Sequence, residues 1–279
     1  MTFGVFEYRN MNDQLEKTDN RAAWAAAIYA KYFICDLLPE YDKCIWLDGD
    51  IIVMRDLAGY YNTDIRGCYL AGVKSPGTNY NVAAEKHAVL PRGKYLLKCI
   101  NVGSLLLNLD ELRKLGGGAY FLKETFAKID SLPPKTPVTE QDMFNYLLTD
   151  KIVYLPLKYN FMIENSNTPE RPYFPFCYDK AAIEEALNEP VIVHYTFKPW
   201  KFTNSNMLYA PPYKKYFKIW ESYYKASPLG GKKLSRKRLW FFYRLWFRVK
   251  PILKSFHFLR KVKRQISKTG NSPIQDFYY

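Results

Sequence analysis

Short apolar runs of strand length recur along this chain, between segments with helical character. The runs are continuous rather than alternating in apolar residues, which is typical of strands in a sheet that is covered on both faces. The expected strands are 43–47, 51–53, 69–73, 104–108, 152–155 and 191–193. The expected helices are 21–38, 110–115, with Gly116 to Gly118 as its C-cap, and 139–148. This alternation predicts an α/β fold, with long irregular insertions at 74–95 and 161–178.

The charge of the chain is concentrated near its C-terminus. The sequence has 41 Lys and Arg against 27 Asp and Glu, a formal net charge of +14. Residues 232–268 hold fourteen of the basic residues and no acidic one, so the rest of the chain has 27 of each sign. A neutral body with a cationic tail favours an enzyme or binding domain tethered to an anionic surface, and we expect no nucleic acid as partner.

The cysteines and the apolar runs indicate where the protein works. Its five cysteines are widely spaced and contain no C-x-x-C pair, so neither a disulfide framework nor a zinc site is indicated. No signal peptide opens the chain, and no uncharged apolar run approaches the ~18 residues of a spanning helix. We therefore expect a protein of the reducing cytoplasm that does not cross a membrane.

The first candidate site is Asp48-Gly49-Asp50, at the end of an apolar run. In extended backbone, residues i and i+2 point the same way, so both carboxylates can converge on one hard divalent cation, which can bridge the phosphates of a nucleotide. The alternative is a hairpin turn, because Asp-Gly between two strands is a favoured turn sequence. An EF-hand is a poorer choice, since its later Gly and Glu are missing.

Four blocks of sequence, taken in order, resemble those of the retaining family-8 glycosyltransferases. They are Trp46 to Val53, Asn101 to Leu109, Glu140 to Asn145 and His194 to Trp200. The resemblance covers roughly residues 21–203, in a family that includes lipopolysaccharide galactosyl- and glucosyltransferases and is related to glycogenin. It implies a GT-A fold, which is a Rossmann-like mixed sheet flanked by helices. It also implies a Mn²⁺ (or Mg²⁺) ion and a UDP-hexose donor.

The resemblance also implies roles for residues around the donor phosphates. Asp48 and Asp50 match the metal-binding Asp-x-Asp, His194 matches the third metal ligand, and Lys198 matches the residue that contacts the phosphates. Such a set leaves coordination positions for diphosphate oxygens, and a lysine stabilises charge on the departing UDP. Without the resemblance, His194 reads as a residue that caps a buried strand.

Further matches lie around the transferred sugar. Asn101 and Gly103 match the segment that lines the donor sugar, or form a bulge at a strand start. Lys31 matches a basic residue that reaches the donor, or is a solvated lysine.

Glu140, Gln141 and Asp142 match the block that holds the sugar, with Gln141 nearest the anomeric carbon. Alternatively, Thr139 and Asp142 form a capping box at a helix start.

The chain also departs from the family pattern. Members begin with a strand and an acidic Asp-Asp-Asn-like turn that receives the uridine, whereas residues 1–20 are polar and aperiodic. We therefore expect an N-terminally truncated nucleotide-binding domain. Lys74 stands where relatives often carry an acid that binds sugar hydroxyls.

The basic tail at 232–268 combines Lys and Arg with Trp, Phe and Tyr at helical spacing. This amphipathic composition suits the interface of an anionic membrane. The alternatives are that the apolar stripe docks on the body, or that the cations bind nucleic acid with aromatic stacking. The neutral body argues against nucleic acid.

These observations predict a retaining hexosyltransferase at the inner face of the cytoplasmic membrane. It would move a hexose from a UDP-sugar to a lipopolysaccharide or other cell-surface glycan or glycolipid acceptor. The alternative is a truncated, noncatalytic relative that binds membrane or a partner. The expected organisation is an irregular segment at 1–20, a GT-A domain at 21–231, the membrane-association segment at 232–268 and a flexible C-terminus at 269–279.

Overall fold

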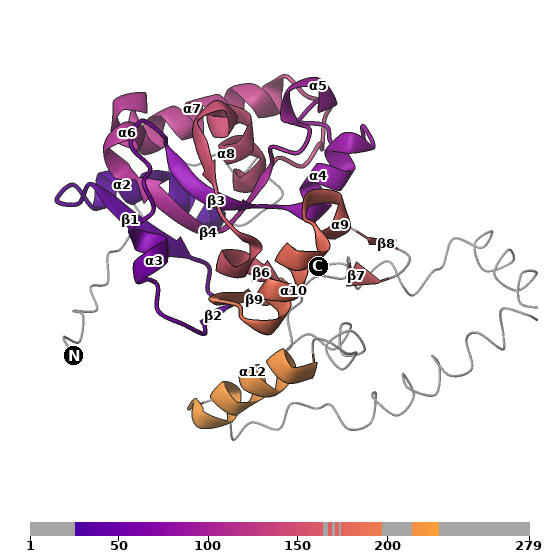
Figure 1. Cartoon of the computed structure of the whole chain (residues 1–279). Helices are drawn as coiled ribbons and strands as arrows, with labels where there is room; N and C mark the ends of the chain where they lie inside the picture. Colours follow the sequence, from indigo (N-terminus) through magenta and orange to yellow (C-terminus); the bar gives the residue numbers. More distant parts are fainter. Residues whose placement is uncertain (1–25, 164–166, 169–170, 173, 197–213, 229–279) are drawn as a thin grey trace, which may run out of the picture. The chain divides into compact units, whose positions relative to one another are not determined.

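The structure, a computed structural model, describes residues 26–163, 167–168, 171–172, 174–196 and 214–228 (Figure 1). The chain divides into two units, with the boundary between Phe197 and Lys198, and each is described by itself. The first unit contains two sheets and the helices around them. In the second unit, the described residues form one helix, α12 (Lys214–Ala226), whose rings of Phe217, Trp220 and Tyr224 contact one another along one face.

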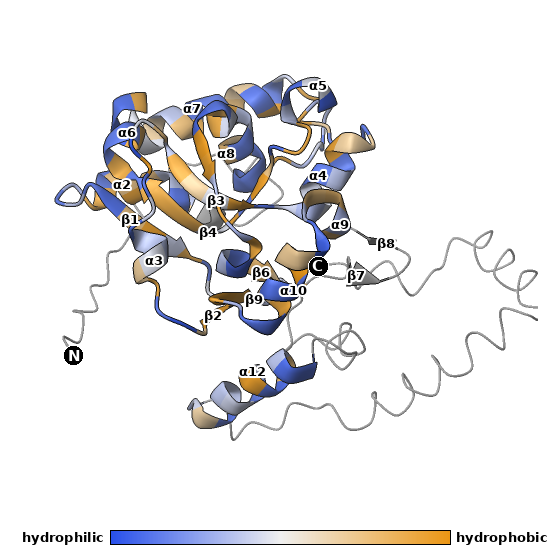
Figure 2. Ribbon diagram, in the orientation of Figure 1, coloured by the Kyte–Doolittle hydropathy of each residue, from blue (hydrophilic) through white to orange (hydrophobic). Residues whose placement is uncertain are grey.

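The larger sheet of the first unit has four strands in the order β1-β4-β3-β5. The strands are β1 (Lys43–Leu47), β3 (Leu70–Lys74), β4 (Ile100–Asn108) and β5 (Ile152–Tyr154). β4 pairs antiparallel with both β1 and β3, and β3 pairs parallel with β5. Each of the four strands contains a continuous apolar run, as the sequence predicts, and hydrophobic colouring is visible along the sheet (Figure 2). The sheet is mixed, and the predicted α/β class is confirmed.

A second, three-stranded sheet lies beside the ends of the first, in the order β2-β9-β6. It consists of β2 (Ile51–Val53), β6 (Phe161–Met162) and β9 (Ile192–His194), with β2 and β9 antiparallel and β6 and β9 parallel. A separate hairpin joins β7 (Asn167–Thr168) and β8 (Arg171–Pro172). Because β1 and β2 belong to different sheets, Asp48-Gly49-Asp50 is a crossover between sheets, and the hairpin interpretation is wrong.

Helices pack around the sheets of the first unit. They are η1 (Ala26–Phe33), α2 (Ile34–Leu37), α3 (Ala58–Tyr61), α4 (Pro76–Ala83), α5 (Arg92–Tyr95), α6 (Leu109–Leu115), α7 (Gly117–Asp130), α8 (Glu140–Leu148), η2 (Thr149–Lys151), η3 (Leu157–Asn160), α9 (Phe174–Cys177) and α10 (Lys180–Asn188). The segments 74–95 and 161–178, predicted to be irregular, contain α4, α5, β6 to β8 and α9, so that prediction is wrong. Helices α7 and α10 are not anticipated by the sequence pattern.

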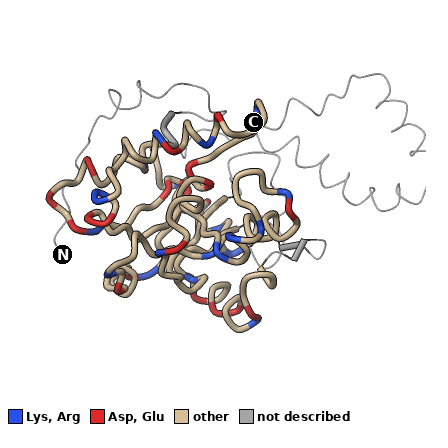
Figure 3. The backbone as a smooth tube through the Cα atoms, turned by 90° about the horizontal axis from the view of Figure 1, so that it is seen from above, with Lys and Arg blue, Asp and Glu red and all other residues tan. Residues whose placement is uncertain are grey.

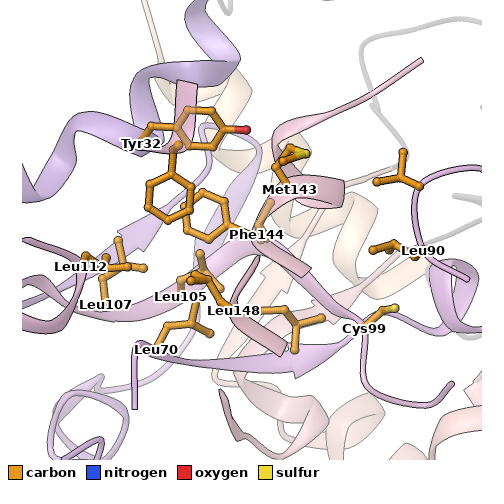
Figure 4. Close-up of a cluster of buried hydrophobic side chains, with 14 of the residues drawn as sticks. Tyr32, Leu70, Leu90, Cys99, Leu105, Leu107, Leu112, Met143, Phe144 and Leu148 are labelled. Carbon is orange, nitrogen blue, oxygen red and sulfur yellow. The ribbon is translucent and has the colours of Figure 1, made fainter. Parts of the chain in front are cut away.

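The core fills the space between the larger sheet and helices η1, α7 and α8 (Figure 4). The rings of Tyr32, Phe121 and Phe144, one from each of these helices, stack at centroid distances of 5.0 to 5.7 Å. They lie over buried leucines of the sheet such as Leu105 and Leu107. Burying a side chain of this size contributes about 1.5–3 kcal/mol, so this cluster anchors the helices to the sheet.

Acidic and basic residues are interspersed along the described chain of the first unit (Figure 3). Several form exposed ion pairs, such as Arg66 with Asp64 at 2.6 Å and Lys158 with Glu185 at 2.7 Å. This distribution agrees with the neutral body inferred from the sequence. No helix in the described residues is both long and apolar enough to span a membrane.

Candidate functional site

Three potential metal ligands meet where the two sheets join. Asp48 follows β1, Asp50 precedes β2, and His194 ends β9. Strand pairing fixes their places, because Ile51 is opposite His194 and the N–H of Tyr195 donates to the carbonyl of Asp50 at 2.8 Å. One ligand atom from each of the three residues lies within 4.8 Å of the other two. The predicted metal-ligating residues are thus brought together.

The histidine is buried and has a polar partner on each ring nitrogen. Only 4% of His194 is exposed. Its Nε2 lies 3.3 Å from Oδ1 of Asp50, and its Nδ1 lies 3.0 Å from Oδ1 of Asn160. Both ring nitrogens of this buried side chain therefore have a polar partner, and these contacts hold the imidazole beside Asp50.

Gly103 lies against this cluster. The N–H of Asp48 donates to its carbonyl at 2.8 Å. A Cβ at this position would overlap the ring of His194 and lie 3.0 Å from Oδ2 of Asp48. The residue also lies where β4 shifts register against β3, between the pairs Gly72–Leu105 and Val73–Asn101. The bulge that the sequence offers as the alternative is therefore present, and Gly103 packs closely against His194 and Asp48.

Lys31 is a buried cation beside the acidic residues, with 3% of it exposed. Its Nζ donates to the carbonyl of Val102 at 2.9 Å and lies 3.2 Å from Asp48 and 3.5 Å from Glu140. The indole N–H of Trp46 also donates to Oδ1 of Asp48, at 2.7 Å. The solvated-lysine interpretation is wrong. Burial raises the pKa of Glu140, and the positive charge of Lys31 opposes that rise.

Side-chain amides connect the metal ligands to the start of α8. The amide N–H of Asn160 donates to Oδ1 of Asn101 at 2.9 Å, and that of Asn101 donates to Oε1 of Gln141 at 3.1 Å. Gln141 in turn donates from Nε2 to the hydroxyl of Thr78 at 3.0 Å. Asn101 and Gln141, predicted to hold the sugar, therefore belong to one continuous network with His194.

Asp142 is held by two partners. Its Oδ2 accepts from the backbone N–H of Thr139 at 2.8 Å, and the backbone N–H of Asp142 donates to the Thr139 hydroxyl at 3.2 Å. The capping box is therefore present. Its Oδ1 lies 3.2 Å from Nε2 of His87. His87 lies in the segment predicted to be irregular, and it lines an open hollow of about 570 Å³ between α4 and α5.

The sequence therefore locates most of the cluster and misses its supports. Asn160, His87, Thr78 and Trp46 carry no motif of their own, although Trp46 lies in a matching block. Lys198 and the tail at 232–268 lie outside the described residues. The three candidate ligands, their described supports and Lys31 form a compact polar site between the sheets and α8.

Comparison with known proteins gives a consistent result. The family model described as Glycosyl transferase family 8 matches residues 2–204. The lipopolysaccharide 1,2-glucosyltransferase of Escherichia coli is 26% identical over 216 residues, which are 76% of this chain and 59% of that protein. Glycosyltransferase 8 domain-containing protein 1 of Xenopus tropicalis is 23% identical over 225 residues, 72% of this chain and 55% of that protein. This chain thus spans little more than half of either relative.

Solved structures show the same fold. The galactosyltransferase LgtC in complex with donor and acceptor sugar analogs superposes with a TM-score of 0.52 at 18% identity, over 77% of this chain and 73% of that one. The bifunctional glycosyltransferase WbbM without ligand gives 0.52 at 22% identity, over 72% of this chain and 38% of that one. The described mixed sheet flanked by helices is accordingly a GT-A fold.

Proposed function

The chain belongs to glycosyl transferase family 8, and on that basis we propose that it transfers a hexose from a UDP-sugar to a glycan with retention at the anomeric carbon. The observation that carries the proposal is the convergence of Asp48, Asp50 and His194, whose ligand atoms lie within 4.8 Å of one another. Two strand ends and a crossover position these side chains, so the set does not depend on a mobile surface loop.

The donor set fits a divalent cation such as Mn²⁺ or Mg²⁺. Two carboxylates and an imidazole are ligands that Mn²⁺ accepts, and they leave positions for phosphate oxygens. Asp48 contacts both Trp46 and Lys31 through Oδ1. Its other oxygen, Oδ2, lies beside Gly103, next to the ring of His194. When bound, the cation would offset negative charge on the leaving diphosphate.

The sugar half of the site would be formed by β4 and α8. We assign donor-sugar contacts to Asn101, Gly103, Glu140, Gln141 and Asp142, and a donor contact to Lys31. Gln141 takes the catalytic role of stabilising positive charge on the sugar ring as the bond to the diphosphate breaks. The hydrogen bonds from Asn101 and to Thr78, which hold its amide in one orientation, support this assignment. We assign Lys198 to the donor phosphates.

The carboxylate of Asp142 already accepts from His87 and Thr139, and these two contacts limit its orientation. Each carboxylate oxygen has two lone pairs, so each can still accept one hydrogen bond from a sugar hydroxyl. In this assignment Asp142 orients the sugar with a carboxylate that cannot rotate.

The acceptor class follows from the relatives. One of them is a lipopolysaccharide glucosyltransferase, so we assign a lipopolysaccharide or other cell-surface glycan or glycolipid as acceptor. The basic segment at 232–268 would hold residues 21–231 at the anionic inner face of the cytoplasmic membrane. Binding to vesicles with and without anionic lipid, with the intact chain and a chain lacking 232–268, tests this part separately.

The central test measures UDP binding and UDP-hexose hydrolysis or transfer with and without Mn²⁺. Asp48→Ala and Asp50→Ala should each abolish the metal-dependent activity while leaving the far-UV spectrum unchanged. Glu184→Gln, an exposed change on α10, is the matched control and should retain activity. Activity retained after loss of both aspartates refutes the metal assignment. Failure of the intact chain to bind UDP with Mn²⁺ favours the noncatalytic alternative.

A further inference from the structure

Asn160 is fully buried at the end of η3 and lies between the two halves of the site. Its side-chain oxygen faces Nδ1 of His194 at 3.0 Å, and its side-chain nitrogen faces Oδ1 of Asn101 at 2.9 Å. A buried amide normally satisfies both of its ends, and here the two ends reach a metal-ligand candidate and a sugar-site candidate. The direction in which this amide points therefore matters for both.

Backbone N–H groups fix that direction, since they can only donate. The N–H of Gly103 donates to Oδ1 of Asn101 at 2.9 Å, which places the Asn101 oxygen toward Gly103 and Asn160. Asn160 must then present its NH₂ to that oxygen. Its own oxygen is left to face His194, so Nδ1 of the imidazole has to carry a proton.

A second backbone group imposes the same direction from the other end of the network. The N–H of Val102 donates to Oε1 of Gln141 at 3.3 Å. The Gln141 oxygen can then accept from the NH₂ of Asn101, which again leaves the Asn101 oxygen for Gly103 and Asn160. The backbone N–H groups of Gly103 and Val102 thus require the same orientations of the side-chain amides that connect α8 to the imidazole.

We infer that Asn160 is the positioning residue of this site: it holds His194 with a proton on Nδ1, so that Nε2 is directed to a divalent cation, and it ties that imidazole to Asn101 and Gln141. The inference rests on the proposed function. Nε2 lies 3.3 Å from Oδ1 of Asp50, on the side of the ring that faces the other candidate ligands, so it is the ring nitrogen placed for a cation.

The first test needs no variant. The chain has three histidines, so long-range ¹H–¹⁵N spectra of the intact, metal-free protein resolve each imidazole separately. In these spectra we expect His194 to show a protonated Nδ1. A His194 ring with its proton on Nε2 and a bare Nδ1 overturns the inference, whether or not the protein transfers sugar.

Three variants then separate the two functions of the amide. Asn160→Leu removes both contacts, and we expect a mixture of His194 tautomers and an Mn²⁺ affinity reduced about 10–100-fold, as for other outer-shell partners of metal-ligating histidines. Asn160→Asp keeps an acceptor for His194 but loses the donor to Asn101. It should keep the tautomer and Mn²⁺ affinity, and lose severalfold in affinity for UDP-hexose relative to UDP.

Asn79→Leu is the matched control, because Asn79 is also fully buried but bonds only backbone groups of Ser75 and Cys99. It should leave the His194 tautomer unchanged even if it lowers stability.

Wild-type tautomer and Mn²⁺ affinity in Asn160→Leu would overturn the positioning role. An unchanged preference for UDP-hexose over UDP in Asn160→Asp would overturn the link to the sugar half. If no variant and no wild type binds Mn²⁺, the proposed function fails while the tautomer spectra still decide this inference.

Discussion

Two histidine–aspartate pairs in the first unit have nearly the same geometry and opposite chemistry. Nε2 of His194 lies 3.3 Å from Oδ1 of Asp50, and Nε2 of His87 lies 3.2 Å from Oδ1 of Asp142. Distance alone would assign both pairs the same role. The partner of the second ring nitrogen distinguishes them, because it decides where the proton of a neutral imidazole resides.

For His87, that partner is a donor: the N–H of Leu90 donates to Nδ1 at 3.3 Å. The ring proton is then on Nε2 and donates to Asp142, which makes an ordinary hydrogen bond. For His194, the partner is the oxygen of Asn160, so the proton of a neutral ring is on Nδ1 and Nε2 is the nitrogen that presents a lone pair on the side of Asp50. The first arrangement is complete as it stands, whereas the second would be completed by the proposed cation. The comparison teaches that two similar histidine–aspartate distances can be distinguished by the partner of the second ring nitrogen.

The largest expected effect is a difference in metal binding between the two histidines. His194→Ala should weaken Mn²⁺ binding by more than about 100-fold, since loss of an outer-shell partner alone typically costs 10–100-fold. His87→Ala should leave the affinity unchanged. Calorimetric or electron-paramagnetic titration of the full chain with Mn²⁺ measures both. Equal losses in the two variants would show that the proton assignment does not separate the pairs.

A smaller effect is expected from crowding only one of the pairs. Gly103→Ala places a methyl group where the His194 ring lies, and overpacking of this kind costs about 1–3 kcal/mol. Urea unfolding measures the loss, and Mn²⁺ affinity should fall with it because the ring must move. Gly93→Ala is the control, since a Cβ there meets no atom within 4 Å. A stable Gly103→Ala variant with normal Mn²⁺ affinity would contradict the close packing of the ring.

The other pair can be tested through helix α8. His87→Ala and Thr139→Ala should each lower the free energy of unfolding by about 1 kcal/mol, because each removes a hydrogen bond of Asp142 or of the helix cap. Since the Thr139 hydroxyl accepts from the backbone N–H of the residue whose carboxylate His87 contacts, the double variant should deviate from additivity by about 0.5 kcal/mol or more. Strict additivity in urea denaturation would mean that His87 does not act through Asp142.

The sequence predicts one pair better than the other for a physical reason. Asp48 and Asp50 share a face because strand geometry has a period of two, and His194 ends an apolar run. His87 has no such local signal, since its contact depends on how α4 and α5 fold over α8. Asn160 is likewise unpredictable, because its role depends on the polarity of partners far away in the sequence.

The glycine run shows the same limit at the level of the fold. Gly116, Gly117 and Gly118 are interpreted as the end of a helix, and Gly116 does terminate α6 with φ at 108°. The next two glycines instead begin α7, where a Cβ would overlap Asp36 and Phe33. The sequence alone cannot separate a glycine that permits a turn from one that permits close packing, so α7 is missed.

The smallest expected effect concerns Glu140, which lies between the two histidine–aspartate pairs. It precedes Gln141 on α8 and contacts Lys31, and Lys31 also contacts Asp48. Burial raises the pKa of Glu140 above its ordinary 4.5, and the Lys31 charge only partly opposes the rise. A carboxyl group whose pKa is raised on folding contributes stability below its unfolded pKa and loses it as pH rises through the folded value. In the metal-free wild type this contribution to the free energy of unfolding therefore falls as pH rises from about 4.5.

Glu140→Gln removes this pH-dependent loss. The variant should therefore become more stable relative to wild type toward neutral pH and show no such gain at acidic pH. Urea unfolding over this pH range measures the difference, and Glu184→Gln, exposed on α10 and paired with Lys180, should reproduce the wild-type curve. A Glu140→Gln variant that is less stable at neutral pH would mean that the attraction between Lys31 and Glu140 outweighs the burial of the carboxylate.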